Sequence, residues 1–209
     1  MYTLYYSPGA ASLVVHLALL ELGVPHELRA VDLKAGAQKS PDYLRLNPNG
    51  VVPTLLIDGE PYYEAAALVL LLGERHPEAD LAPQAGDSQR ATYLQWTLHL
   101  ANTLQPAFRL WFYPADAGAV DADAVKAAAR TRIEAAWDRL DAHLAARGPY
   151  MLGERFSLLD LYLTMLMRWS RNMPRPATEW PHLAALAAHI KARPSFRRAY
   201  EIEGLTEWA

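Results

Sequence analysis

Apolar residues follow two periods along the chain. Over the first 76 residues, short apolar or alternating runs typical of strands are interleaved with runs at the three-to-four spacing typical of helices. Strands are predicted at 2–6, 26–33, 51–57 and 61–63, with helices at 12–22, 41–46 and 64–74. The predicted order is therefore β-α-β-α-β-β-α, and its first 33 residues have the size of one βαβ unit.

The pattern from residue 89 onward is helical throughout, with helices predicted at 89–110, 125–147, 158–170, 182–192 and 195–201. The run 158–170 is almost wholly apolar, which predicts a buried helix. Ser157 and Asp160 form an S-x-x-D capping box at its start. Segment 77–88 contains prolines and a glycine without periodicity. We therefore predict an α/β domain at 1–76, a linker at 77–88 and an all-helical domain at 89–209.

Composition narrows the functional classes. The 209 residues contain 20 Lys and Arg against 23 Asp and Glu, a net charge of −3, which provides no basic field for nucleic acid. The absence of cysteine excludes disulfides, thiolate metal sites and a cysteine nucleophile. Charges or prolines interrupt every apolar stretch before the roughly 20 residues of a membrane span. We expect a cytoplasmic protein that does not bind membranes.

Common nucleotide, metal and hydrolase motifs are absent from the sequence. It has no Gly-x-Gly-x-x-Gly, phosphate loop, His-Glu-x-x-His or Gly-x-Ser-x-Gly. The seven histidines are scattered, and without nearby carboxylate or thiol partners they are more often solvated or capping residues than ligands. We predict no metal site.

Val52-Pro53 is the sharpest local feature, because a proline at the start of a strand-like run requires a bend or a cis bond. A cis bond would turn the Val52 backbone groups outward, where they could bind a peptide. Glu64 begins a predicted helix whose free N–H groups at Ala65 and Ala66 form an anion site. A plain bend and simple helix capping are the structural alternatives. Together, the two features suit a small acidic peptide.

Four segments carry a family resemblance, and together they span most of the chain. The chain resembles bacterial glutathione S-transferases, with the beta class nearest, through LYYSPGAASL at 4–13, NPNGVVP at 47–53, EAAAL at 64–68 and FSLLDLY at 156–162. The resemblance implies a thioredoxin-like N-terminal domain followed by an all-α C-terminal domain. It also implies glutathione as co-substrate without a tightly bound cofactor.

The resemblance assigns glutathione-binding roles to particular residues. Val52 would pair its backbone with the cysteinyl part of glutathione, and Pro53 would be the cis proline that permits this pairing. Glu64 and the Ala65 amide would hold the γ-glutamyl end. Lys34 would reach the glycyl carboxylate.

A second site would take a small hydrophobic electrophile. Its candidate residues are Gln105, Phe108, Arg168 and Trp169. The family also implies a homodimer, and aromatic residues crowd the first long helix of the second domain, although such clustering can equally be core.

The departures from the beta class concern the thiol. Ala11 occupies the place of the usual cysteine, which excludes a mixed disulfide there, and Ala65 replaces a serine. Activation of a glutathione thiol must then come from hydrogen bonding. Ser12 is the leading donor, followed by Tyr6 and Tyr5, although Ser12 can also be a helix cap without substrate contact.

Three functions remain open from the sequence. The first is a transferase that stabilises the glutathione thiolate and conjugates it to small hydrophobic electrophiles. The second is a non-catalytic binder of glutathione or apolar ligands. The third is a glutathione-dependent isomerase or lyase, whose glutathione half would be the same.

Overall fold

The computed structural model describes residues 1–118 and 121–208. The chain divides into two compact units, one made of Met1–Gln84 with Lys191–Ala209 and the other of Ala85–Ile190. The predicted second domain, 89–209, includes residues 119, 120 and 209, which lie outside the described part. The division in the structure differs from the predicted domains, because it places the segment from Lys191 onward with the N-terminal unit.

The first unit is built on a four-stranded sheet with the order β2-β1-β3-β4. Strand β1 pairs in parallel with β2, while β3 is antiparallel to both β1 and β4. The strands are β1 Tyr2–Tyr6, β2 His26–Ala30, β3 Thr54–Ile57 and β4 Glu60–Tyr63, and the helices between and after them are α1 Ser12–Glu21, α2 Pro41–Leu46 and α3 Ala65–Arg75. The predicted order β-α-β-α-β-β-α is confirmed.

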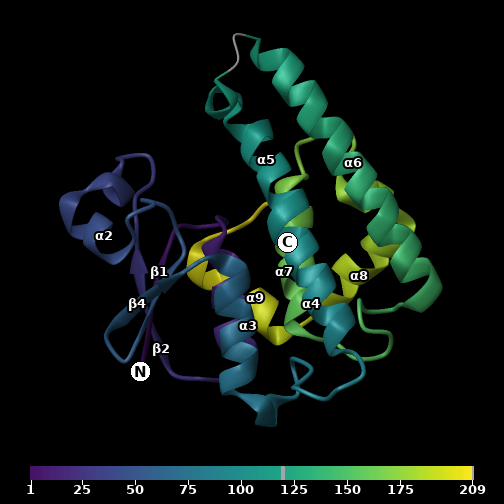
Figure 1. The fold of residues 1–209 in the computed structure, drawn as a ribbon, viewed down its shortest axis with the longest axis horizontal. Helices are drawn as coiled ribbons and strands as arrows, with labels where there is room; N and C mark the ends of the chain where they lie inside the picture. Colours follow the sequence, from purple (N-terminus) through teal and green to yellow (C-terminus); the bar gives the residue numbers. More distant parts are fainter. Residues whose placement is uncertain (119–120, 209) are drawn as a thin grey trace. The chain divides into compact units, whose positions relative to one another are not determined.

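Helix α1 is the centre of this unit's core. Its residues Ser12 to Leu19 are all buried, so it has no solvent face over most of its length. It packs against β1, α3 and the C-terminal helix α9 (Pro194–Glu203). Figure 1 shows α2 on one side of the strands, with α3 and α9 on the other.

Element ends depart from the predictions for local reasons. The third strand starts at Thr54 rather than 51, because Pro53 lacks the N–H that a ladder position needs. The second strand ends at Ala30 rather than 33. Glu64 occupies the N-cap position of α3, so the helix itself begins at Ala65. The N-cap position of α1 is Ala11, not Ser12.

The second unit consists of helices. They are α4 Arg90–His99, η3 Leu100–Leu104, α5 Gln105–Phe112, α6 Ala122–Arg147, α7 Leu158–Trp169 and most of α8 Pro181–Lys191. Short 3-10 helices are η1 Ala37–Lys39, η2 Pro77–Ala79, η4 Pro114–Ala117 and η5 Ala177–Glu179. The single helix predicted at 89–110 is divided by the π-helical η3. Pro106 lies just beyond and has no N–H for the α-helical ladder, which accounts for the change of register.

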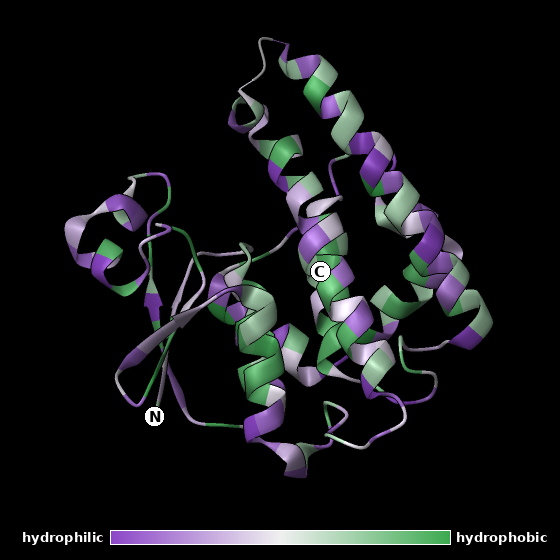
Figure 2. Ribbon diagram, viewed as in Figure 1, coloured by the Kyte–Doolittle hydropathy of each residue, from purple (hydrophilic) through white to green (hydrophobic). Residues whose placement is uncertain are grey.

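Helices α6 and α7 differ as their sequences require. Helix α6 alternates between hydrophilic and hydrophobic residues along its length (Figure 2), and it buries a stripe that includes Ile133, Trp137 and Leu140. Helix α7 is buried from Leu158 to Arg168, as predicted. Within the described residues, no helix is both long and apolar enough to cross a membrane.

The predicted capping box at the start of α7 is present. The Asp160 carboxyl accepts hydrogen bonds from the Ser157 N–H at 2.8 Å, the Ser157 hydroxyl at 3.0 Å and the Met151 N–H at 2.8 Å. Burial raises the pKa of Asp160 to about 6, against the opposing effect of these hydrogen bonds. This carboxyl therefore binds its proton more tightly in the folded chain than in the unfolded one.

Asp160 is expected to make stability depend on pH. Because its folded pKa lies above its ordinary value of 3.8, its contribution is fully present below pH 3.8 and is lost as pH rises through about 6. The loss amounts to about 3 kcal/mol. Urea unfolding of the natural protein and Asp160→Asn at several pH values should show this fall as the difference between the two curves. If the natural protein instead became more stable relative to Asp160→Asn as pH rises, the three hydrogen bonds would outweigh burial.

Candidate glutathione site

The sheet register brings the predicted glutathione-binding residues to one end of the sheet. Tyr5 pairs with Thr54, which pairs in turn with Tyr63, so these residues form one row across β1, β3 and β4. The next position toward this end of the sheet is Tyr6 at the end of β1, Pro53 before β3 and Glu64 after β4. Strand β2 runs parallel to β1 and leads at this same end toward Lys34.

A buried polar cluster fixes the segment that leads into β3. The Tyr43 hydroxyl donates to the Val51 carbonyl at 2.8 Å and lies 2.9 Å from Thr54 Oγ1. Asn47 Nδ2 donates to the same two oxygens, at 2.9 and 3.2 Å. Burial raises the pKa of Tyr43, so its hydroxyl retains the proton that it donates. The Val51 carbonyl is therefore fixed by both Tyr43 and Asn47.

Val52 follows directly and has unused backbone groups. The Val52-Pro53 peptide bond is cis, as the resemblance implies, whereas a plain bend was the local alternative. The Val52 side chain is buried with Val31 and Tyr43. In the described part of the chain, no residue forms a hydrogen bond with the Val52 N–H or C=O. This pair of groups is available to an extended ligand backbone.

Glu64 lies at the start of α3 in an unfavourable backbone conformation. Its φ of 76° is in the region that non-glycine residues rarely adopt, at a cost of about 1–3 kcal/mol. Its side chain is exposed and makes no capping hydrogen bond, while Ala65 and Ala66 are buried. The first-turn N–H groups of α3 thus meet an exposed carboxylate beside them, which suits a ligand carrying both an anion and a cation.

The three candidate thiol donors have different surroundings. Ser12 is fully buried, and its Oγ accepts from the Ser7 N–H at 3.1 Å and donates to the Ser7 carbonyl at 3.2 Å. Its hydroxyl therefore closes the turn before α1. Tyr6 packs against His16, with ring centroids 6.2 Å apart, whereas Tyr5 packs edge-on to Tyr43 in the cluster that contains Val52. The two tyrosines lie on opposite faces of β1, as their adjacency requires.

Lys34 and Lys39 are two cations in the segment between β2 and α2. Lys34 is exposed in the turn after β2, where its N–H donates to Asp32. Lys39, which sequence analysis did not single out, donates through Nζ to the Asn49 carbonyl at 3.1 Å and lies against Gly50. No local pattern in the sequence distinguishes Lys39, because the contact depends on how η1 folds back onto the turn.

The predicted electrophile-binding residues all lie in the second unit. The Phe108 ring lies 5.8 Å from that of Trp169, and Phe112 stacks on Phe108. Phe108 is fully buried and Trp169 is partly buried, while Phe112 is 45% exposed, so Phe112 has the most exposed ring of the three. Arg168 is buried, and the Gln105 side chain accepts a hydrogen bond from the Tyr162 hydroxyl.

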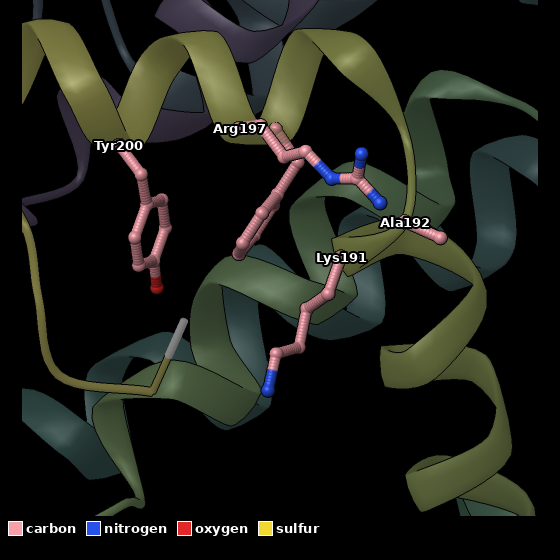
Figure 3. Close-up of a pocket in the computed structure, with 5 residues that line it drawn as sticks. Lys191, Ala192, Arg197 and Tyr200 are labelled. Carbon is pink, nitrogen blue, oxygen red and sulfur yellow. The ribbon is translucent and has the colours of Figure 1, made fainter.

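A pocket of about 390 Å³ in the first unit is lined by none of the predicted residues. Its walls are Lys191, Ala192, Phe196, Arg197 and Tyr200. In Figure 3 the Lys191 side chain extends from the end of α8, and the Arg197 and Tyr200 side chains extend from α9.

Comparison with known proteins identifies the family. The model for "Glutathione S-transferase, N-terminal domain" matches residues 10–75, and that for "Glutathione S-transferase, C-terminal domain" matches residues 123–192. The glutathione S-transferase GST-4.5 of Xanthomonas campestris is 32% identical over 206 residues, which cover 97% of this chain and 98% of that protein. The chain belongs to the glutathione S-transferase family.

Other members of the family extend the comparison. A sphingomonad glutathione S-transferase, solved in complex with glutathione, is 34% identical with a TM-score of 0.86, over 98% of this chain and 100% of that one. A maleylacetoacetate isomerase of Dictyostelium discoideum is 29% identical over 198 residues, 93% of this chain and 90% of that protein. The thioredoxin-like and all-helical halves expected from the sequence are thus those of this transferase family.

Asn47 is expected to be the residue on which the shape of the Val51-Val52 segment depends most. It is fully buried, and its amide also accepts from the Asn49 N–H at 3.1 Å. Asn47→Ala should lower the free energy of unfolding by about 2–3 kcal/mol, because it leaves buried partners unpaired. Exposed Asn49→Ala is the matched control, with an expected change within about 0.5 kcal/mol. Equal effects in urea unfolding would contradict this role.

Proposed function

We propose that this family member is a glutathione transferase that binds glutathione, stabilises its thiolate and transfers it to small hydrophobic electrophiles. The unused backbone pair at Val52 is the observation that supports this most strongly. An extended peptide can add to such an edge as another strand would, by pairing its own N–H and C=O. The cysteinyl residue of glutathione would form this pair.

The ends of glutathione would meet charges of opposite sign. Its γ-glutamyl carboxylate would accept from the N–H groups at Ala65 and Ala66, and its ammonium would pair with the Glu64 carboxylate. The glycyl carboxylate would reach Lys34, as the family resemblance implies, or Lys39, which lies beside the turn before Val52. The strain at Glu64 is consistent with a residue held for binding rather than for folding.

The thiol would lie at the start of α1. A free thiol of this kind has a pKa of about 8.5, and each unit of depression corresponds to about 1.4 kcal/mol of preference for the thiolate. The first-turn N–H groups of α1, at Ala11 and Ser12, offer hydrogen bonds and the positive end of the helix. The Ser12 hydroxyl would act by shaping this turn, or by moving its proton from the long bond to Ser7 onto the sulfur.

The remaining assignments follow the family. The electrophile site would include Gln105, Phe108, Arg168 and Trp169, with Phe112 offering the exposed ring. The domain limits 1–76, 77–88 and 89–209, the cytoplasmic location and the homodimer remain proposals. Leu98, Phe112 and Tyr113 are exposed hydrophobic residues along α4 and α5 that a partner subunit could cover.

A glutathione-dependent isomerase is the second candidate. The similarity to a maleylacetoacetate isomerase supports it, and the glutathione half of the site would serve either reaction. An isomerase returns glutathione unchanged, whereas a transferase consumes it in a stable adduct. A non-catalytic binder would leave the thiol with its ordinary pKa. Measuring glutathione consumption with a panel of electrophiles and with isomerisable substrates distinguishes the three functions. A transferase consumes glutathione, an isomerase turns its substrate over without consuming glutathione, and a non-catalytic binder does neither.

Glu64→Gln is expected to weaken glutathione binding about tenfold, because it replaces a charge-assisted hydrogen bond with a neutral one. The control is Glu60→Gln, an exposed glutamate at the opposite end of β4. Ultraviolet difference titration measures affinity and thiolate together. Failure of the natural protein to bind glutathione would overturn the proposed function, and equal affinities in both variants would remove Glu64 from the site.

Three hydroxyl deletions test thiol activation. Ser12→Ala should raise the pKa of bound glutathione by about one unit and lower turnover, with affinity largely kept. Tyr6→Phe and Tyr5→Phe remove only a phenol and should leave that pKa unchanged. The thiolate absorbance across pH gives each value directly. A shift in a tyrosine variant alone would transfer the role to that phenol, and no shift in any would leave it to the backbone amides.

A further inference from the structure

A buried carboxylate from the C-terminal helix meets the turn at the start of α1. Glu203, the last residue of α9, accepts a hydrogen bond from the Gly9 N–H at 2.8 Å through one oxygen. Its other oxygen lies 2.7 Å from His16 Nδ1. The side chains of Glu203 and His16 have no exposed surface, and all three residues belong to the first unit.

The position of Glu203 is unfavourable for a purely local role. A carboxylate at the C-terminus of a helix faces the negative end of the helix dipole, and burial adds the cost of desolvation. Packing α9 on α1 would be served as well by an apolar residue of similar size. The carboxylate is therefore explained by its two partners rather than by its own helix.

Its partner Gly9 is a buried residue of the turn between β1 and α1, next to the exposed Pro8. Inside the turn, the bonds between Ser12 and Ser7 and the Ala10 N–H to the Ser7 carbonyl, at 3.1 Å, hold residues 7–12 together. Gly9, whose φ is +66°, follows Ser7 and Pro8 within this turn. The Gly9 N–H donates to Glu203, 194 positions along the chain.

His16 completes the arrangement from within α1. Its ring lies 6.2 Å from Tyr6 and 5.8 Å, edge-on, from His26, so neighbouring rings hold it in place. Its Nδ1 donates toward Glu203, while Nε2 meets no hydrogen-bonding atom of residues 1–118 or 121–208. The imidazole thus orients the carboxylate so that the other oxygen faces Gly9.

We propose that Glu203 is a positioning residue: oriented by His16, its carboxylate holds the Gly9 N–H and keeps the first turn of α1 aligned with the glutathione thiol. This inference rests on the proposed function. Glu203 itself does not touch the ligand, and it acts only through the turn. The C-terminal helix then contributes to thiol activation although the activating groups come from the N-terminus.

Glu203→Gln tests the proposal, because it keeps the size of the side chain and removes the charge that strengthens the Gly9 bond. The pKa of bound glutathione should rise by about one unit, which lowers the thiolate fraction at neutral pH up to about tenfold. The glutathione dissociation constant should change by less than about threefold, because the Val52 and Glu64 contacts remain. Glu201→Gln, exposed and on the same helix, is the matched control and should behave as the natural protein does.

Amide hydrogen exchange separates this inference from the proposed function. In the natural protein the Gly9 amide should exchange slowly, and Glu203→Gln should accelerate it at least about tenfold while the Leu4 amide of β1 is unaffected. Rapid Gly9 exchange in the natural protein would overturn the proposal even if the variant does not fold. Lower stability with an unchanged thiol pKa would also overturn it. Absence of glutathione binding by the natural protein would instead refute the proposed function, and the exchange result would still decide whether Glu203 holds the turn.

Discussion

The pairing of β3 with both of its neighbours is the constraint on which the candidate site depends. Because Tyr5, Thr54 and Tyr63 lie in one row, Tyr6 and Glu64, which follow Tyr5 and Tyr63, come to the same end of the sheet as Pro53, which precedes Thr54. A slip of one residue would turn the side chains of β3 to the other face and separate Val52 from the start of α3. The buried Thr54 hydroxyl, bound by Tyr43 and Asn47, opposes such a slip.

Buried polar groups occur at chain reversals in both units. Asn47 holds the turn before Val52, Glu203 holds the turn at Gly9, and Asp160 holds the chain entering α7. Asn47 and Asp160 each bond two backbone groups, and Glu203 bonds the Gly9 N–H and the His16 side chain. Buried backbone groups need such partners. Turns lack the regular backbone hydrogen bonds of helices and strands. Side chains with two or more polar atoms bond the buried N–H and C=O groups of these turns instead.

The sequence predicted the elements well and long-range contacts poorly, for physical reasons. Periodicity and the S-x-x-D pattern are local, so the strand and helix order and the Asp160 cap could be predicted. The π-helical segment before Pro106 was not predicted, although its cause, a proline without an N–H, is local. Lys39 and Glu203 are ordinary charged residues in their local sequence, and only tertiary folding brings them to Asn49 and Gly9. Val52-Pro53 is intermediate, because local sequence allowed a bend and only the family resemblance favoured the cis bond.

The absence of cysteine changes what the protein must supply. In the proposed function the reactive sulfur arrives with glutathione, so the chain needs only to bind the peptide and favour its thiolate. Backbone amides can do both, at Val52 for the peptide and at the start of α1 for the charge. The part of such a site that consists of amides depends on backbone position rather than on the identity of the side chains. In the proposed function, buried Asn47, His16 and Glu203 would keep these amides in position without touching the ligand.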